Sequence, residues 1–128
     1  MTTSRPAPKI PGADHPITVT PPGRRVTVRI GDTVLADTTG ALTLQESNYP
    51  AVQYVPLADI EPGRLERTET HTYCPYKGEA SYYSLVVLDA DVEPTDAVWT
   101  YENPYEAVAA IAGHVAFYPD RVTISVTD

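Results

Sequence analysis

The sequence predicts a single, mainly β domain preceded by a flexible N-terminal arm. Several short segments alternate apolar and polar residues, which is the pattern of a half-buried strand. Turn residues separate these segments at short intervals. Only one segment, near residues 104–112, carries convincing signals for a short helix. A chain of 128 residues is long enough to form one hydrophobic core without disulfides.

The arm is predicted over residues 1–24, and the folded domain over residues 25–128. Six prolines fall within the first 24 residues, which show almost no hydrophobic periodicity. Proline lacks a backbone N–H and disfavours both helix and strand pairing. We therefore expect ordered structure to begin at the segment RVTVRI (25–30).

The first half of the domain is predicted to form three strands and one helical turn. The two-residue Gly31-Asp32 connection predicts that TVLADT (33–38) pairs back on RVTVRI as an antiparallel hairpin. ALTLQES (41–47) follows as a third strand. Pro56 precedes a single helical turn, and Pro62-Gly63 ends it.

The second half is predicted to contain the central strand and the helix. LERTETHTY (65–73) is a charged strand, ASYYSLVVLD (80–89) is the most apolar strand, and AVWTYE (97–102) follows a VEPTD turn. Asn103 as cap, Pro104 at the first position and Gly113 at the end predict a helix of about two turns. HVAFY and RVTISV are predicted to close the domain as a hairpin through Pro119-Asp120.

Charge and composition disfavour several partners. The net charge is −8, and residues 30–128 carry 16 acidic side chains against four basic ones. Long-range repulsion therefore disfavours nucleic acid as a partner. No apolar run approaches the roughly 20 residues that a membrane helix needs, and the N-terminus lacks the apolar stretch of a signal peptide. We expect a cytoplasmic protein without membrane contact.

The segment TYCPYKGEASYY (72–83) contains the best candidates for a functional site. Pro75 and Gly78 predict a turn that leads into the apolar strand. Lys77 is unexplained by that turn, and a partly desolvated lysine could bind an anion or act as a nucleophile. Cys74 is either a nucleophile, with His71 three residues away, or an inert buried thiol. Because this is the only cysteine, a disulfide and a thiolate metal site are both excluded, and we expect no metal or cofactor.

Several motifs along the chain resemble a bacterial and fungal family catalogued as domain of unknown function 427. They are Glu46, Tyr49-Pro50, Tyr54-Val55-Pro56, Asp59, the segment 72–83, W-x-Y-x-x-P at 99–104 and I-A-G-x-V-A-F-Y at 111–118. The resemblance covers about residues 25–126. It implies a fold similar to the β-tent domains, in which two antiparallel sheets lean together over a cleft. Some collections label this family nucleotidyltransferase-like. The resemblance also implies that these positions are important: Glu46, Tyr54, Cys74, Lys77, Gly78, Tyr82 and Trp99.

Two functions stay open on this basis, along with a structural alternative. In the first, a cleft lined by Tyr54, Tyr82, Trp99 and Tyr101 binds a small anionic or aromatic ligand such as a nucleotide. Lys77 would then supply charge, Glu46 an acid or base, and Cys74 a third candidate catalytic group. In the second, the same aromatic cleft binds a protein or peptide without catalysis. In the structural alternative, the tyrosines belong to the core and to a homodimer interface. The sequence contains no known catalytic motif that would decide whether the protein is an enzyme.

Overall fold

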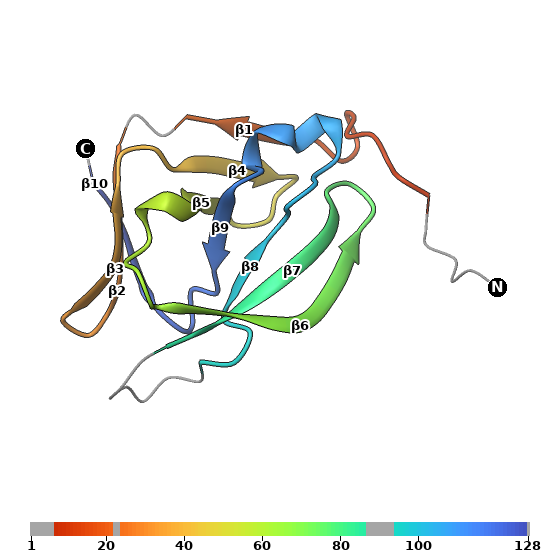
Figure 1. Cartoon of the computed structure of the whole chain (residues 1–128). Helices are drawn as coiled ribbons and strands as arrows, with labels where there is room; N and C mark the ends of the chain where they lie inside the picture. The colour runs from red at the N-terminus through yellow and green to blue at the C-terminus, as the bar shows by residue number, and fades with distance from the viewer. Residues whose placement is uncertain (1–6, 22–23, 87–93, 128) are drawn as a thin grey trace.

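The computed structural model describes residues 7–21, 24–86 and 94–127, which form ten strands and two short 3₁₀ helices (Figure 1). In chain order these are β1 (Ile17–Thr20), β2 (Arg25–Ile30), β3 (Thr33–Thr38), β4 (Leu42–Glu46), β5 (Val52–Pro56), η1 (Leu57–Asp59), β6 (Leu65–Cys74), β7 (Gly78–Leu85), β8 (Val98–Thr100), η2 (Glu106–Ile111), β9 (His114–Phe117) and β10 (Thr123–Thr127). Within the described residues, no helix is long and apolar enough to cross a membrane.

The strands form two antiparallel sheets, which confirms the predicted mainly β fold class. The larger sheet has the order β1-β4-β5-β9-β8-β7-β6, and the smaller one has the order β10-β2-β3. The predicted hairpin between residues 25–30 and 33–38 is present as β2 and β3, with Gly31 at a φ of 56°. The predicted third strand is β4, and the predicted turn after Pro56 is η1.

Strand alternation divides the apolar side chains of the larger sheet into two clusters. On β9, Val115 and Phe117 join the cluster that faces the smaller sheet, whereas Ala116 belongs to the second cluster. Val98 and Trp99 on β8 separate in the same way. Since successive side chains of a strand point to opposite faces, the larger sheet is apolar on both faces. The second cluster lies on the face turned away from the smaller sheet.

The structure differs from the sequence prediction within residues 1–24. Ile17–Thr20 forms β1, which pairs with β4 from Ile17 opposite Glu46 to Thr20 opposite Thr43. The segment ITVT contains no proline and alternates in burial, so it can pair although prolines flank it. Residues 1–6 and 22–23 of the predicted arm lie outside the described residues. The ordered part of the domain therefore begins before Arg25.

The predicted helix near residues 104–112 is present as the 3₁₀ helix η2, not as two α-helical turns. Tyr105 precedes it and makes no side-chain cap, so the predicted capping role of Asn103 is wrong. Val108 has a non-helical backbone at φ −127° and ψ 25°. Val108 and Ile111 are both buried, and a spacing of three residues matches the 3₁₀ repeat. Gly113 follows the helix at a φ of 77°, as expected for a terminating glycine.

The predicted closing hairpin is also wrong. β9 pairs with β5 and β8 in the larger sheet, whereas β10 pairs with β2 in the smaller sheet. The chain between β9 and β10 therefore crosses from one sheet to the other. Phe117 on one side of this crossing and Ile124 on the other both pack on the core between the sheets. The prediction also missed strand β5. The end of the predicted strand 80–89 lies outside the described residues from position 87 onward.

We predict that Gly78→Ala destabilises the protein by about 1–3 kcal/mol, the usual cost of a strained backbone position. Gly78 has a φ of 109°, and a Cβ built there would lie 3.4 Å from the carbonyl oxygen of Asn103. Gly12→Ala is the control, because its added Cβ meets only Asp14 Oδ1 at an ordinary 3.7 Å. The change at Gly12 should stay within about 0.5 kcal/mol. Urea unfolding measures both, and equal values for the two variants would contradict this account.

Candidate functional site

The second apolar cluster surrounds a cavity of about 180 Å³ on the face of the larger sheet turned away from the smaller one. Its wall is built from strands β4, β5, β7 and β8 and from the loops that follow β4, β6, β8 and β9. Six of the seven site residues predicted from the sequence line it, and Cys74 does not. The lining residues are Leu44, Glu46, Tyr49, Pro50, Val52, Tyr54, Lys77, Tyr82, Trp99, Tyr101 and Tyr118.

The β6–β7 turn holds Lys77 in place at this wall. The Lys77 N–H donates to the carbonyl of Cys74 at 3.2 Å, and the Lys77 carbonyl accepts from the N–H of Tyr105 at 3.0 Å. Pro75 and Gly78 flank this segment, as the turn prediction required. The residue is only 9% exposed, although lysine is among the residue types most rarely buried without a partner. Such burial requires a charge partner.

That partner is Glu46, at the end of β4. Lys77 Nζ donates to Glu46 Oε1 at 2.5 Å, and the ammonium lies 6.0 Å from the centroid of the Tyr101 ring. The second carboxylate oxygen of Glu46 pairs with His15 Nε2 at 2.8 Å. Burial alone would raise the pKa of Glu46, but the hydrogen bonds from Lys77 and His15 outweigh it and lower that pKa below its ordinary value. Glu46 is therefore ionised at neutral pH.

The N-terminal segment contributes His15, which the sequence analysis missed. Its ring stacks on Tyr76 with the centroids 4.1 Å apart and the planes 11° apart. The Lys9 N–H donates to the carbonyl of Pro75 at 2.9 Å, so the segment lies along the turn that carries Lys77. His15 lies between prolines in a stretch without periodicity, so no sequence signal placed it near Glu46.

Aromatic side chains form most of the remaining wall. Trp99 Nε1 donates to the Tyr54 hydroxyl at 3.1 Å, and the two rings meet edge to face at 6.4 Å. Tyr118 also packs against Trp99, with 4.6 Å between ring centroids and an angle of 48° between the planes. Tyr118 follows β9 directly and ends the I-A-G-x-V-A-F-Y motif, but it was not predicted as a site residue. Tyr49 is 58% exposed and stands at the cavity mouth.

Three phenols of the wall, those of Tyr54, Tyr101 and Tyr118, stay neutral over the ordinary pH range because their pKa values are raised. Burial raises the pKa of Tyr54 and of Tyr101 far above the usual value for tyrosine. Burial, followed by the hydrogen bond to Tyr82, raises the pKa of Tyr118 to about 12. Neutral hydroxyls both donate and accept hydrogen bonds, so the wall offers polar contacts without added charge.

Cys74 lies outside the cavity wall. Its partly buried side chain packs against the second apolar cluster, and residue 74 pairs with Gly78 across the turn. His71 is the nearest histidine in sequence, but its Nδ1 approaches Ser81 and Glu79 instead. The geometry therefore favours the inert, packed thiol over the nucleophile.

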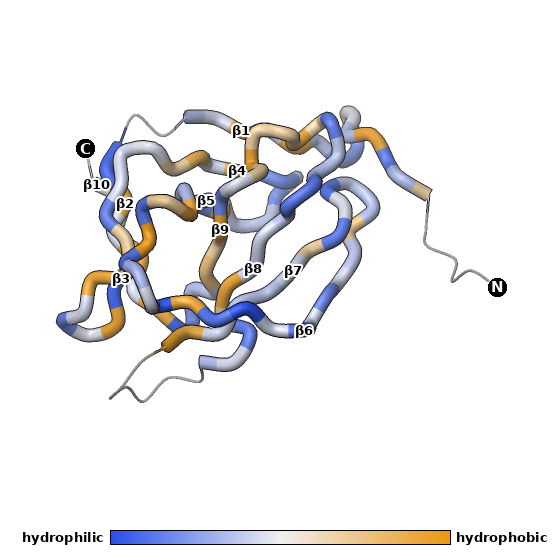
Figure 2. The backbone as a smooth tube through the Cα atoms, in the orientation of Figure 1, coloured by the Kyte–Doolittle hydropathy of each residue, from blue (hydrophilic) through white to orange (hydrophobic). Residues whose placement is uncertain are grey.

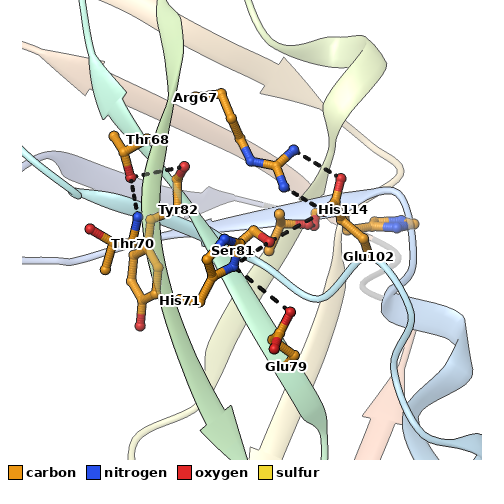
Figure 3. Close-up of polar contacts among 10 residues, drawn as sticks. Arg67, Thr68, Thr70, His71, Glu79, Ser81, Tyr82, Glu102 and His114 are labelled. Atoms are coloured by element: carbon orange, nitrogen blue, oxygen red, sulfur yellow. Dashed lines mark hydrogen bonds and ion pairs between the residues drawn. The ribbon is translucent and has the colours of Figure 1, made fainter.

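Polar side chains of β6 and β7 form a separate group, away from the cavity wall, that includes a serine, a histidine and a glutamate (Figure 3). Ser81 Oγ lies 3.4 Å from His71 Nδ1, and Glu79 Oε1 lies 3.9 Å from the same nitrogen. A catalytic triad instead uses the two ring nitrogens for the nucleophile and the carboxylate. Ser81 is 4% exposed and donates to Glu102 at 3.2 Å. This group is a hydrogen-bonded surface network and lacks the arrangement of a hydrolase site.

Residues 7–21, 24–86 and 94–127 contain no group of three or more His, Cys, Asp or Glu side chains placed to hold a metal ion. The cavity wall itself offers one carboxylate, one ammonium, tyrosine hydroxyls and aromatic rings. The cavity combines one neutralised ion pair with a largely aromatic wall.

We predict that the stabilisation lost on Glu46→Gln depends on pH. Because the pKa of Glu46 is lowered in the folded state, its contribution is fully present above the unfolded pKa of about 4.3 and is lost as pH falls through the folded value. Asp37 and Asp96 also have lowered pKa values, but they are common to both proteins and cancel in the difference. The difference in unfolding free energy between the wild type and the variant should stay constant from pH 7 to about pH 5 and should shrink as pH falls below about 4.3 toward pH 3. A difference that stays constant down to about pH 3 would show that the charge of Glu46 does not contribute.

A comparison with known protein families finds a match that covers nearly the whole described domain. Residues 18–128 match the model of a family described as a domain of unknown function (DUF427). The name of this family model refers to nucleotidyltransferases. No curated protein matches the chain. The matched range includes β2 to β10, all of β1 except Ile17, and every lining residue of the cavity. The chain therefore belongs to the DUF427 family.

Proposed function

We propose that this protein binds a small molecule with a single aromatic ring, either neutral or singly negative, in the cavity beside Lys77 and Glu46. The observation that carries the proposal is the convergence of a buried ion pair and five buried or half-buried aromatic side chains on one cavity. Apolar walls with a few fixed polar groups are the usual composition of a ligand site. The aromatic residues are Tyr54, Tyr82, Trp99, Tyr101 and Tyr118.

The size of the cavity limits the ligand. A volume of about 180 Å³ corresponds to roughly six water molecules at ~30 Å³ each. Pockets for drug-sized ligands usually measure about 300–1,000 Å³. A whole nucleotide exceeds this space, so only its base would fit. A free ring with one or two substituents matches the cavity better.

Charge limits the ligand further. Lys77 is already neutralised by Glu46, so the pair together has no net charge, and protonation of His15 would add only one positive charge. A phosphate would have to displace Glu46 from Lys77 and would bring two charges. A carboxylate would also compete with Glu46 for Lys77, but it brings only one charge and therefore suits the single ammonium better than a phosphate does. Neutral rings can also bind, through the tyrosine hydroxyls and Trp99.

The proposed function of the cavity is ligand binding and does not include transfer of a nucleotidyl group. Enzymes that transfer phosphoryl groups rely on metal ions held by acidic side chains and on further cations around the phosphates. Among the described residues, the cavity wall contains one acidic side chain and one cation, Glu46 and Lys77. Because its pKa is lowered, Glu46 is ionised and could accept a proton but not donate one near neutral pH.

A second candidate function is capture of an aromatic side chain from a peptide. The cavity has the size of one side chain, and the exposed Tyr49 with Pro50 borders its opening, where a peptide backbone would pass. This alternative differs from the first in its ligand and uses the same wall.

We predict that benzoate and benzamide raise the melting temperature, with benzoate more effective, and that AMP and inorganic phosphate do not. A ligand that binds only the folded state at ten times its dissociation constant contributes about 1.4 kcal/mol of stability. N-acetyltyrosinamide, tested in the same thermal-shift assay, represents the peptide alternative. Stabilisation by N-acetyltyrosinamide alone would support the peptide function instead. If none of these compounds shifts the melting temperature, the cavity does not bind rings of this size.

The two lysines of the chain supply a matched pair of variants. Lys77→Met keeps the aliphatic stem and removes the charge, so it should abolish the preference for benzoate over benzamide. It should also lower the melting temperature of the unliganded protein, because Glu46 loses its buried partner. Lys9→Met makes the same chemical change outside the cavity, where Lys9 Nζ lies 5.8 Å from the Tyr76 ring centroid. Lys9→Met should leave both ligands unaffected. An equal loss of benzoate binding in both variants would contradict a specific role for Lys77.

A further inference from the structure

The two sheets have four edges, and three of them are protected against pairing with another chain. β6 carries Glu66, Arg67 and Glu69, has a bulge between Arg67 and His71, and is mostly hydrophilic in Figure 2. Charged side chains and bulges are common ways to protect an edge strand. β1 packs against η2. At the edge of β3, Ala36 forms an isolated β-bridge with Ile60. Beside it, the Glu61 N–H donates a hydrogen bond to the Leu35 carbonyl at 2.8 Å.

The fourth edge, β10, has none of these protections within the described residues. β10 is the outer strand of the smaller sheet and reads TISVT, without a charge, proline or glycine. Val126 is 39% exposed although it is apolar. Strands rich in β-branched residues at an unprotected edge form a template for pairing with another strand. β10 is therefore the edge where an intermolecular strand could add.

We propose that β10 pairs antiparallel with β10 of a second copy of this chain, centred on Ser125. The sequence of β10 is close to a palindrome about that residue. In this register Ser125 faces Ser125 of the other copy, Ile124 faces Val126, and Thr123 faces Thr127. Cross-strand pairs of β-branched residues and of threonines are favourable in antiparallel sheets. Such a self-complementary contact fits a two-fold symmetric dimer.

The register within the sheet supports this pairing. Ile124 lies opposite Val28 and Val126 opposite Val26, so both point to the apolar inner face. Ile124 packs against the core between the sheets, but Val126 remains exposed. In the dimer, Val126 of each copy would lie beside Ile124 of the other, which extends the apolar face across a six-stranded sheet. The pairing therefore covers an apolar side chain that the single chain leaves open.

Charge also favours this face as the contact between two copies. The chain has a net charge of −8, so two copies repel each other over most of their surfaces. The smaller sheet is an exception: its strands carry Arg25 and Arg29 against Asp37, and β10 carries no charge. A five-residue ladder alone buries less than the roughly 1,200 Å² of a typical stable interface. We expect a weak dimer that dissociates on dilution.

Sedimentation velocity from about 10 μM to about 1 mM covers the range in which weak complexes dissociate. The wild type should shift from monomer toward dimer as concentration rises. Val126→Lys places two charges in the contact and should weaken association at least tenfold. Val34→Lys is the matched control, because Val34 is also an exposed valine, 45% exposed, on the opposite edge strand of the same sheet. A wild type that stays monomeric, or equal weakening by both variants, would overturn the proposal.

Disulfide trapping tests the register and does not depend on the folding of the lysine variants. Ser125→Cys places two cysteines opposite each other on the two-fold axis and should give a covalent dimer under mild oxidation. Thr127→Cys should not, because two residues at position 127 would lie about 13 Å apart along the strands, and disulfides need Cα atoms within about 7 Å. The wild type, with Cys74 alone, is the reference. No dimer from Ser125→Cys, or equal trapping at both positions, would refute pairing centred on Ser125.

Discussion

The ion pair between Lys77 and Glu46 is the interaction on which the site depends. It joins the β6–β7 turn to the end of β4, two segments that belong to opposite halves of the larger sheet. Their side chains are only 11% and 16% exposed, so each would be a costly buried charge without the other. Removing one partner of a buried pair costs about 3–5 kcal/mol, although the net contribution of such pairs is small. We infer that the pair mainly positions the cavity wall.

The aromatic wall depends on a second constraint, the two-residue period of the strands. Tyr54, Tyr82 and Trp99 face the cavity because their neighbours Val55, Tyr83 and Val98 face the smaller sheet. A shift of one residue in the pairing of any of these strands would exchange the two faces. The core between the sheets therefore fixes the register, and the register delivers the rings to the cavity. His15 then closes the outer side of the ion pair from the N-terminal segment.

Local sequence patterns correctly predicted the hairpin and the turn whose conformation depends on neighbouring residues. The β2–β3 hairpin follows from Gly31-Asp32 and alternation, and the turn at Lys77 follows from Pro75 and Gly78. The grouping of Glu46, Lys77 and the aromatic residues was inferred from a family resemblance, and the structure brings them together. The separation of β9 from β10, the pairing of β1 and the position of His15 depend on contacts between distant segments. The 3₁₀ conformation of η2 and the non-helical backbone of Val108 also depart from the local signals for an α-helix.

The single tryptophan offers the most direct test of the ligand site. Its indole N–H donates to Tyr54, and both residues line the cavity. In a proton–nitrogen NMR spectrum, the N–H resonance of Trp99 should shift progressively and reach saturation as benzoate is added. With Lys77→Met, a higher benzoate concentration should be needed to reach the same shift, because the ammonium that attracts the carboxylate is gone. A Trp99 resonance that does not move up to the solubility limit of benzoate would contradict the account of the cavity as a site for small aromatic ligands.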